Sequence, residues 1–182
     1  GEERYSEIPR AMVVSGDYVT PRLNGVKYFE KPALFYWMQA GSIKLFGVNE
    51  WALRLWPALL GLLGCLAVYG AGRKLYGRRA GLIAAAVLAT SPLYYLLARI
   101  ITLDMAVSVL LSGALLSFLL GVRESPGRTR SLYLYAFYAL CALATLTKGL
   151  IGIVIPAMVI GAWIVLLWDW CLLRAIHLPT GL

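Results

Sequence analysis

The sequence predicts an all-α protein whose helices cross a lipid bilayer several times. Hydrophobic residues make up 60% of the 182 residues and charged residues only 14%, and the mean hydropathy is +0.74, a composition outside the range of soluble domains. The apolar residues gather in runs of about 20, the length a helix needs to cross about 30 Å of hydrocarbon. Basic residues concentrate in alternate connections between these runs, as in multi-pass membrane proteins.

Two regions are expected along the chain. Residues 1–51 are too polar to span and hold six of the nine acidic residues, so we expect a loop with juxtamembrane helices there, and we expect the chemistry to lie in it. Residues 52–182 form the predicted membrane region, with about five spans. These runs are residues 52–72, 80–98, 100–122, 132–147 and 149–168.

The polar region begins with a predicted amphipathic helix at the membrane interface. Tyr5, Ile8 and Met12 fall on one helical stripe, which suits a helix that lies along the bilayer surface. Gly16 is expected to end this helix, and residues 18–30 read as an extended loop.

A second interfacial helix is predicted over residues 33–46. Pro32 stands at its first turn, where a missing backbone N–H costs little. Its aromatic residues suit the headgroup level. They are Tyr36, Trp37 and Phe46. Asn49 is a candidate cap for the first span.

The distribution of Lys and Arg predicts the orientation, because short basic connections stay in the cytoplasm. The basic connections hold Arg73, Lys74, Arg78 and Arg79, then Arg123, Arg128 and Arg130, then Arg174. The intervening turns hold only Arg99 and Lys148. By alternation, residues 1–51 and the turns near Asp104 and Lys148 lie outside the cytoplasm.

Cysteines and net charge favour no other class of protein. The three cysteines lie in or at the ends of apolar runs without close spacing, which is typical of small buried hydrophobic residues. The net charge of +8 is explained by anionic lipid and membrane insertion, so no nucleic-acid partner is expected. No cleavable signal peptide is visible, because the chain opens on charged residues, and we expect a preceding segment to be missing.

Two polar clusters and two single charged residues are candidates for chemistry. Glu2, Glu3, Arg4 and Tyr5 offer carboxylates for acid/base work or a metal, or a solvated helix end. Glu30-Lys31-Pro32 places a lysine before a helix start, which suits phosphate, although a snorkelling lysine gives the same pattern. The remaining two are Asp104 and Lys148.

Asp104 is costly at the edge of an apolar run and therefore indicates a cavity or a partner. Arg99, five residues earlier, offers a structural ion pair as the alternative. Lys148 is either a topology anchor or a second phosphate contact. His177 stands alone near the end of the chain and reads as a surface residue.

A resemblance to a known family rests on linked stretches of this sequence. They are GEERYSEIPRAMVVSGDYVTPRLNGVKYFEKPALFYW, ARIITLDMAVS, LTKGLIG and the closing HLPTG. Together they resemble the N-terminal part of the bacterial aminoarabinose transferases, which group with the protein O-mannosyltransferases among the polytopic GT-C glycosyltransferases. The resemblance covers the whole chain and implies an N-terminal fragment, which we expect to be inactive alone.

This resemblance implies a glycosyltransferase that moves 4-amino-4-deoxy-L-arabinose from undecaprenyl phosphate to a lipid A phosphate. Such enzymes work at the periplasmic face of the bacterial inner membrane, and the lipopolysaccharide modification is linked to polymyxin resistance. The implied partners are membrane lipids, the lipid-linked sugar and the lipid A acceptor. The sequence does not fix the sugar, the acceptor or the oligomeric state, and a divalent cation is an open option for the cofactor.

The resemblance also assigns roles to individual residues. Asp104, Glu2 and Glu3 are the expected catalytic residues. Arg4, Tyr5, Glu30, Lys31 and Lys148 are the expected substrate-binding residues, with Lys31 on the carrier phosphate. The family's Asp-Glu-x-Arg-Tyr motif reads Gly1-Glu2-Glu3-Arg4-Tyr5 here, with glycine at the expected catalytic aspartate. Ala33 also replaces a proline common in relatives.

Three alternatives stay open on the sequence. The protein could transfer another sugar or use another acceptor, as in protein O-mannosyl transfer. A transporter or flippase part would also explain the intramembrane charges at Asp104 and Lys148, although the polar residues gather at one face and no inverted repeat is visible. A scaffold without catalysis is the third alternative.

Overall fold

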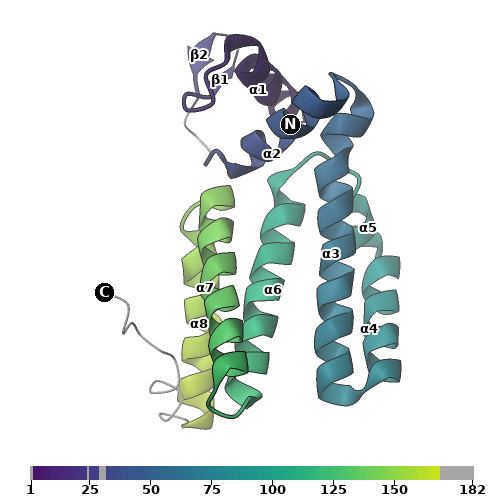
Figure 1. The fold of residues 1–182 in the computed structure, drawn as a ribbon, viewed down its shortest axis with the longest axis vertical. Helices are drawn as coiled ribbons and strands as arrows, with labels where there is room; N and C mark the ends of the chain where they lie inside the picture. The colour runs from purple at the N-terminus through teal and green to yellow at the C-terminus, as the bar shows by residue number, and fades with distance from the viewer. Residues whose placement is uncertain (1, 24, 29–31, 169–182) are drawn as a thin grey trace.

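The chain folds into a helical bundle with a smaller helical layer across one end, as a computed structural model shows (Figure 1). The structure describes residues 2–23, 25–28 and 32–168. The helices of the bundle are α3 (Glu50–Tyr76), α4 (Arg78–Thr90), α5 (Pro92–Leu97), α6 (Leu103–Arg123), α7 (Arg128–Lys148) and α8 (Ile151–Leu167). The layer across the end consists of α1 (Glu2–Ser15), β1 (Arg22–Leu23), β2 (Val26–Lys27) and α2 (Leu34–Phe46).

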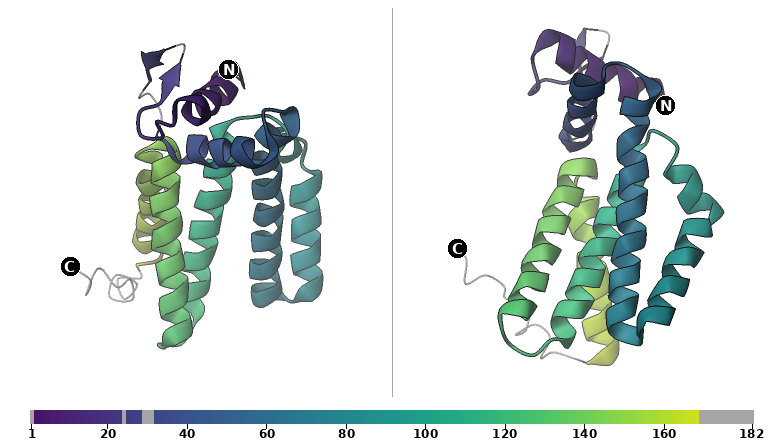
Figure 2. Two further views of the ribbon diagram at one scale, coloured as in Figure 1. Left: turned by 45° about the horizontal axis from the view of Figure 1, so that its top comes forward. Right: turned by 45° about the vertical axis from the view of Figure 1, so that its right-hand side comes forward.

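We call this layer the cap and the end of the bundle beneath it the capped end (Figure 2). The helix α6 is central, because it packs against α3, α7 and α8. The starts of α3 and α6 and the end of α7 all lie at the capped end, whereas the α3–α4 and α6–α7 turns lie at the opposite end (Figure 1).

Among the residues that the structure describes, two helices, α3 and α6, are long and apolar enough to cross a membrane by length and composition. The helix α8 is apolar but has only 17 residues. Large apolar side chains on the outer faces are exposed, among them Leu62, Leu66 and Val154, as expected for side chains that contact lipid. The predicted apolar runs all form helices with shifts of a few residues at their ends, and one run is divided in two.

The divided run is the predicted run 80–98, which forms two helices rather than one. The break falls at Ser91, which has extended backbone geometry (φ −64°, ψ 122°) and caps both helices. Pro92 lacks a backbone N–H and begins α5 at its first position, where proline is favoured. The prediction of one continuous span was wrong here because it read hydropathy and ignored this proline.

Glycines allow α3 and α4 to pack backbone against backbone. A Cβ on Gly81 would lie 2.7 Å from the Arg73 nitrogen and 2.7 Å from the Tyr69 carbonyl oxygen, so no side chain fits there. The α3–α4 contact therefore depends on a small residue, as close helix pairs in membranes commonly do.

The opposite end of the bundle is joined by one lysine. Lys74 of α3 forms an ion pair with Glu124 after α6 and donates a hydrogen bond of 3.1 Å to the Tyr133 hydroxyl of α7. Its ammonium also lies 4.5 Å from the centre of the Tyr133 ring. These contacts tie three helices together far from the cap.

The cap has its own small core. Ile8 and Met12 of α1 are buried against Tyr36 and Ala40 of α2. These two residues of the predicted apolar stripe therefore share one face, but that face packs against α2, and the position of the Tyr5 side chain is not described. Tyr36 was predicted at the headgroup level, but its side chain is fully buried, because α1 folds back over the face of α2 that carries it.

The predicted second helix and the predicted cap of the first span are both present. Trp37 is half-exposed and its indole Nε1 donates to the Tyr18 carbonyl at 2.7 Å. The helix α2 spans Leu34–Phe46 with Ala33 as its N-cap, so it begins one residue after the predicted start at residue 33. Asn49 caps α3 as predicted, since its Oδ1 accepts from the Ala52 nitrogen at 2.8 Å.

Candidate functional site

The capped end brings together two of the predicted site residues, Asp104 and Lys148. Asp104 lies in the first turn of α6 and Lys148 in the last turn of α7. The Lys148 ammonium donates to the Asp104 Oδ1 and forms an ion pair with it. The residues are 44 positions apart in the sequence, so only the antiparallel packing of α6 and α7 makes them neighbours.

Each charge stands at the helix end that favours it. The first turn of a helix carries partial positive charge and the last turn partial negative charge. An acid at the start of α6 and a lysine at the end of α7 therefore stabilise both helices as well as each other. Gly149 ends α7 with φ +77°, a conformation that glycine adopts without strain.

The sequence neighbours of the ion pair are buried, whereas its charged side chains are partly exposed. Leu103 and Met105, on either side of Asp104, are buried, and Thr147 beside Lys148 is buried with its hydroxyl donating to the Leu143 carbonyl at 2.7 Å. Asp104 keeps 48% of its side-chain surface exposed and Lys148 keeps 31%. Such a pair can still exchange a partner for a ligand.

The sequence offered an ion pair between Asp104 and Arg99 as the structural alternative, and that partner was wrong. Asp104 pairs with Lys148, while the Arg99 guanidinium lies over the Tyr95 ring at 4.5 Å from its centre. Arg99 follows the end of α5, and no ion pair joins it to Asp104 among the described residues. The ion pair at this end is therefore built between two long helices.

The remaining predicted site residues lie partly or wholly outside the described residues. Glu2, Glu3, Arg4 and Tyr5 belong to the α1 backbone, but the positions of their side chains are not described. Glu30 and Lys31 fall outside the described residues. Their roles stay predictions. The helix α2, which begins three residues after Lys31, does pack against α7, the helix that carries Lys148.

Two buried polar atoms near the capped end had not been predicted. Gln39 of α2 is fully buried, and its Oε1 has no hydrogen-bond partner among the described residues. The Thr102 hydroxyl, which precedes α6, is likewise buried and unpartnered within that part of the chain. Threonine before a helix is typical of an N-cap, but here the hydroxyl makes no cap hydrogen bond. Sequence reasoning had no signal for the burial of Gln39.

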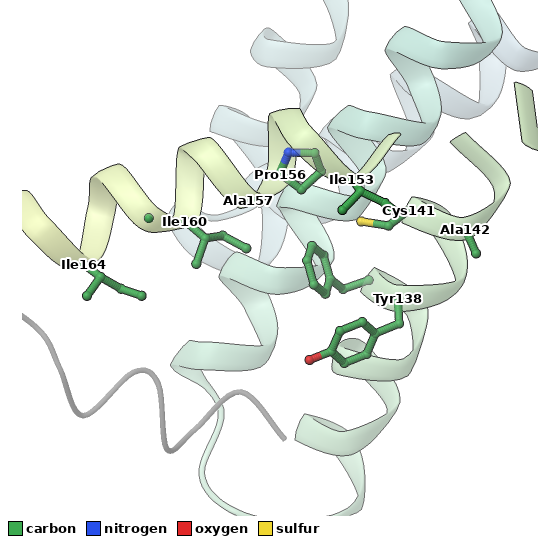
Figure 3. A pocket seen from close by; sticks show the side chains of 10 residues that line it. Tyr138, Cys141, Ala142, Ile153, Pro156, Ala157, Ile160 and Ile164 are labelled. Atoms are coloured by element: carbon green, nitrogen blue, oxygen red, sulfur yellow. The ribbon is translucent and has the colours of Figure 1, made fainter. Parts of the chain in front are cut away.

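A separate cavity between α7 and α8 is apolar (Figure 3). It measures about 520 Å³ and is lined by residues such as Tyr138, Cys141, Pro156 and Ile160, without a charged side chain. It therefore suits hydrocarbon rather than phosphate. Within the described residues, no three His, Cys, Asp or Glu side chains come close enough to hold a metal ion.

Comparison with known proteins places this arrangement in a family. Residues 30–182 match the family described as dolichyl-phosphate-mannose-protein mannosyltransferase. The undecaprenyl phosphate-alpha-4-amino-4-deoxy-L-arabinose arabinosyl transferase of Aeromonas salmonicida is 36% identical over 165 residues, which cover 90% of this chain and 30% of that protein. The protein of the same description from Edwardsiella ictaluri is 32% identical over 170 residues, covering 93% and 31%.

Two solved structures have the same fold. The crystal structure of ArnT from Cupriavidus metallidurans in the apo state matches with a TM-score of 0.94 and 38% identity, over 99% of this chain and 34% of that chain. The same protein bound to undecaprenyl phosphate matches with a TM-score of 0.94 over 100% of this chain and 34% of that chain. The chain thus spans about a third of the length of the relatives it matches.

These matches confirm the predicted all-α, polytopic GT-C fold and the resemblance to the aminoarabinose transferases. They agree with the helical bundle and its cap, where Asp104 and Lys148 from two of the quoted motifs meet at the capped end. The chain therefore belongs to the dolichyl-phosphate-mannose-protein mannosyltransferase family.

Proposed function

We propose that the complete protein containing this chain transfers 4-amino-4-deoxy-L-arabinose from undecaprenyl phosphate to a lipid A phosphate. In this proposal the described segment forms one wall of the reaction cavity at the capped end. The observation that carries it is the match to a solved structure bound to undecaprenyl phosphate, at a TM-score of 0.94 and 38% identity over the whole chain.

Positive charge near the cap would assist the departure of the carrier phosphate. The bond between the sugar carbon and the carrier phosphate oxygen breaks, the electron pair stays on that oxygen, and an oxygen of the acceptor phosphate forms the new bond to the sugar. Lys148 supplies a fixed positive charge that stabilises the departing phosphate. The acceptor phosphate is already anionic, so this step needs little help from a general base.

Asp104 would position Lys148 and contact the sugar. An ammonium has three donors, so Lys148 can keep its bond to Asp104 Oδ1 while it donates to a phosphate. The other carboxylate oxygen of this half-exposed side chain is available to the positively charged amine of the sugar. A neutral sugar would lack this contact, which favours an amino sugar over mannose.

The cap and the ion pair are proposed to face the periplasm from the bacterial inner membrane. The α3–α4 and α6–α7 turns lie at the other end of the bundle (Figure 1), and arginines stand at the helix ends beside them, where the positive-inside rule puts the cytoplasm. Single cysteines at Asp17 and Arg78 in a cysteine-free complete protein test this. An impermeant thiol reagent is expected to label position 17 and not position 78 in intact spheroplasts, and the reverse result would overturn the orientation.

The transfer itself is tested with the complete protein, the lipid-linked aminoarabinose and lipid A. Lys31→Ala is expected to weaken carrier binding, and Lys31→Arg to keep part of it because the charge survives. Lys44→Ala is the matched control, since Lys44 is exposed at the far end of α2. Transfer of mannose to a protein hydroxyl, with none to lipid A, would reject this function in favour of the protein O-mannosyl alternative.

A further inference from the structure

A second cavity, lined by charged and apolar side chains, lies at the capped end, and neither Asp104 nor Lys148 lines it. It opens between the start of α3 and the end of α5 and measures about 490 Å³. Two arginines, Arg54 and Arg99, line it together with Glu50. The apolar part of its wall is formed by Trp51, Leu55 and Ala58.

Both arginines have hydrogen-bonding capacity to spare. Arg54 reaches Glu50 only at 4.0 Å, and both side chains are at least half-exposed, so this pair holds the arginine weakly. Arg99 has no carboxylate partner among the described residues, because the nearby acid Asp104 is paired with Lys148. Its guanidinium is held over the Tyr95 ring, an arrangement that leaves the N–H donors at its edge free.

The cavity matches the two parts of a lipid headgroup. Guanidinium groups bind phosphate through paired, charge-assisted hydrogen bonds. Leu55 and Ala58 continue the wall along α3 toward the membrane region, where they would meet the apolar part of a lipid. Trp51 is 87% exposed beside them, as is typical of aromatic residues at the headgroup level.

An ordinary membrane anchor explains this arrangement less well. Arginines that only snorkel from helix ends point separately toward water. Here two arginines from elements 45 positions apart in the sequence line one cavity, and one of them is fixed by an aromatic ring.

We propose that Arg54 and Arg99 form a binding site for the phosphate of a membrane lipid, distinct from the site of sugar transfer. The site holds a phosphate-bearing headgroup at the edge of the bundle, with the lipid tail along α3. It takes part in no bond-making step, so it does not depend on the function proposed above.

The test is lipid binding to the complete protein, purified in detergent and followed by native mass spectrometry. Short-chain phosphatidic acid is the probe, phosphatidylcholine the lipid control and inorganic phosphate the competitor. Wild type is expected to retain phosphatidic acid over phosphatidylcholine. Arg54→Gln and Arg99→Gln are each expected to weaken this retention about tenfold, and the double variant to abolish the preference.

Three controls keep the result specific. Arg78→Gln removes an exposed arginine at the opposite end of the bundle and should bind like wild type. Lys148→Gln should keep this binding even where sugar transfer is lost, which separates this site from the transfer site. Arg99→Lys keeps the positive charge at this position and should keep part of the binding. The melting temperatures of Arg99→Lys and Arg99→Gln are compared with that of the wild type to separate loss of binding from misfolding.

Two results would overturn the proposal. Equal retention of phosphatidic acid by wild type and by the folded double variant would return both arginines to membrane anchors. Displacement of the lipid by inorganic phosphate at equal concentration would show that the cavity binds the free anion and does not recognise a lipid.

Discussion

The contact between Asp104 and Lys148 makes a quantitative prediction that separates stability from catalysis. The two side chains join the start of α6 to the end of α7. Asp104→Asn and Lys148→Gln each remove one charge with little change in shape. The pair of variants and their combination form a double-mutant cycle, which measures the coupling between the two residues.

The structure sets the expected magnitudes. Since both side chains keep contact with solvent, the ion pair itself is worth about 1 kcal/mol, not the larger penalty of a buried pair. Each charge also gains about 0.5 kcal/mol from its helix end. Each single variant should therefore lose about 1.5 kcal/mol and the double variant about 2 kcal/mol, which gives a coupling energy of about 1 kcal/mol.

Activity should follow a different pattern from stability. If Lys148 stabilises the departing phosphate, Lys148→Gln should lower transfer about 100-fold, and the double variant should not recover it. The assays are denaturant unfolding in detergent and sugar transfer by the complete protein. Asp104→Asn combined with Arg99→Gln is the matched control, with a coupling energy near zero because these residues do not pair.

Two outcomes would refute this reasoning. Recovery of transfer in the Asp104→Asn, Lys148→Gln double variant would show that the pair is only structural. Coupling of Asp104 to Arg99, with none to Lys148, would contradict the geometry itself.

Three further predictions concern the helices and the cap. Gly81→Ala should cost about 1–3 kcal/mol of unfolding free energy because its Cβ meets the α3 backbone, whereas Gly70→Ala, with open space around it, should change it by about 0.5 kcal/mol or less. Asn49→Ala should cost about 1 kcal/mol in the same assay, since the cap of α3 is lost, and Asn49→Asp should keep most of it. Asp17 accepts hydrogen bonds from the Val19 and Thr20 nitrogens, and the Thr20 N–H chiefly lowers the pKa of its carboxyl. Asp17→Ala should therefore speed proteolysis of the loop after α1. In the wild type, the protection of this loop should be complete above about pH 4 and should decline as the pH falls through the lowered pKa of Asp17.

Local features of the structure could be predicted from the sequence. Apolar runs of spanning length gave helices because a backbone in lipid must satisfy its hydrogen bonds internally. Asn49 as a cap and Gly16 after α1 were also predictable, because capping involves residues within one turn. The break at Pro92 could have been predicted in the same way, since proline acts on its own turn.

Contacts between distant helices were decided by the tertiary structure alone. Asp104 has an arginine five residues away, yet it pairs with Lys148 across the α6–α7 contact, and Tyr36 is buried only because α1 returns over α2. Hydropathy fixes which segments enter the membrane, but a side chain's partner depends on the direction and register in which helices pack. The sequence thus determined which residues reach the capped end, and only the packing of α6 against α7 decided which of them share a site.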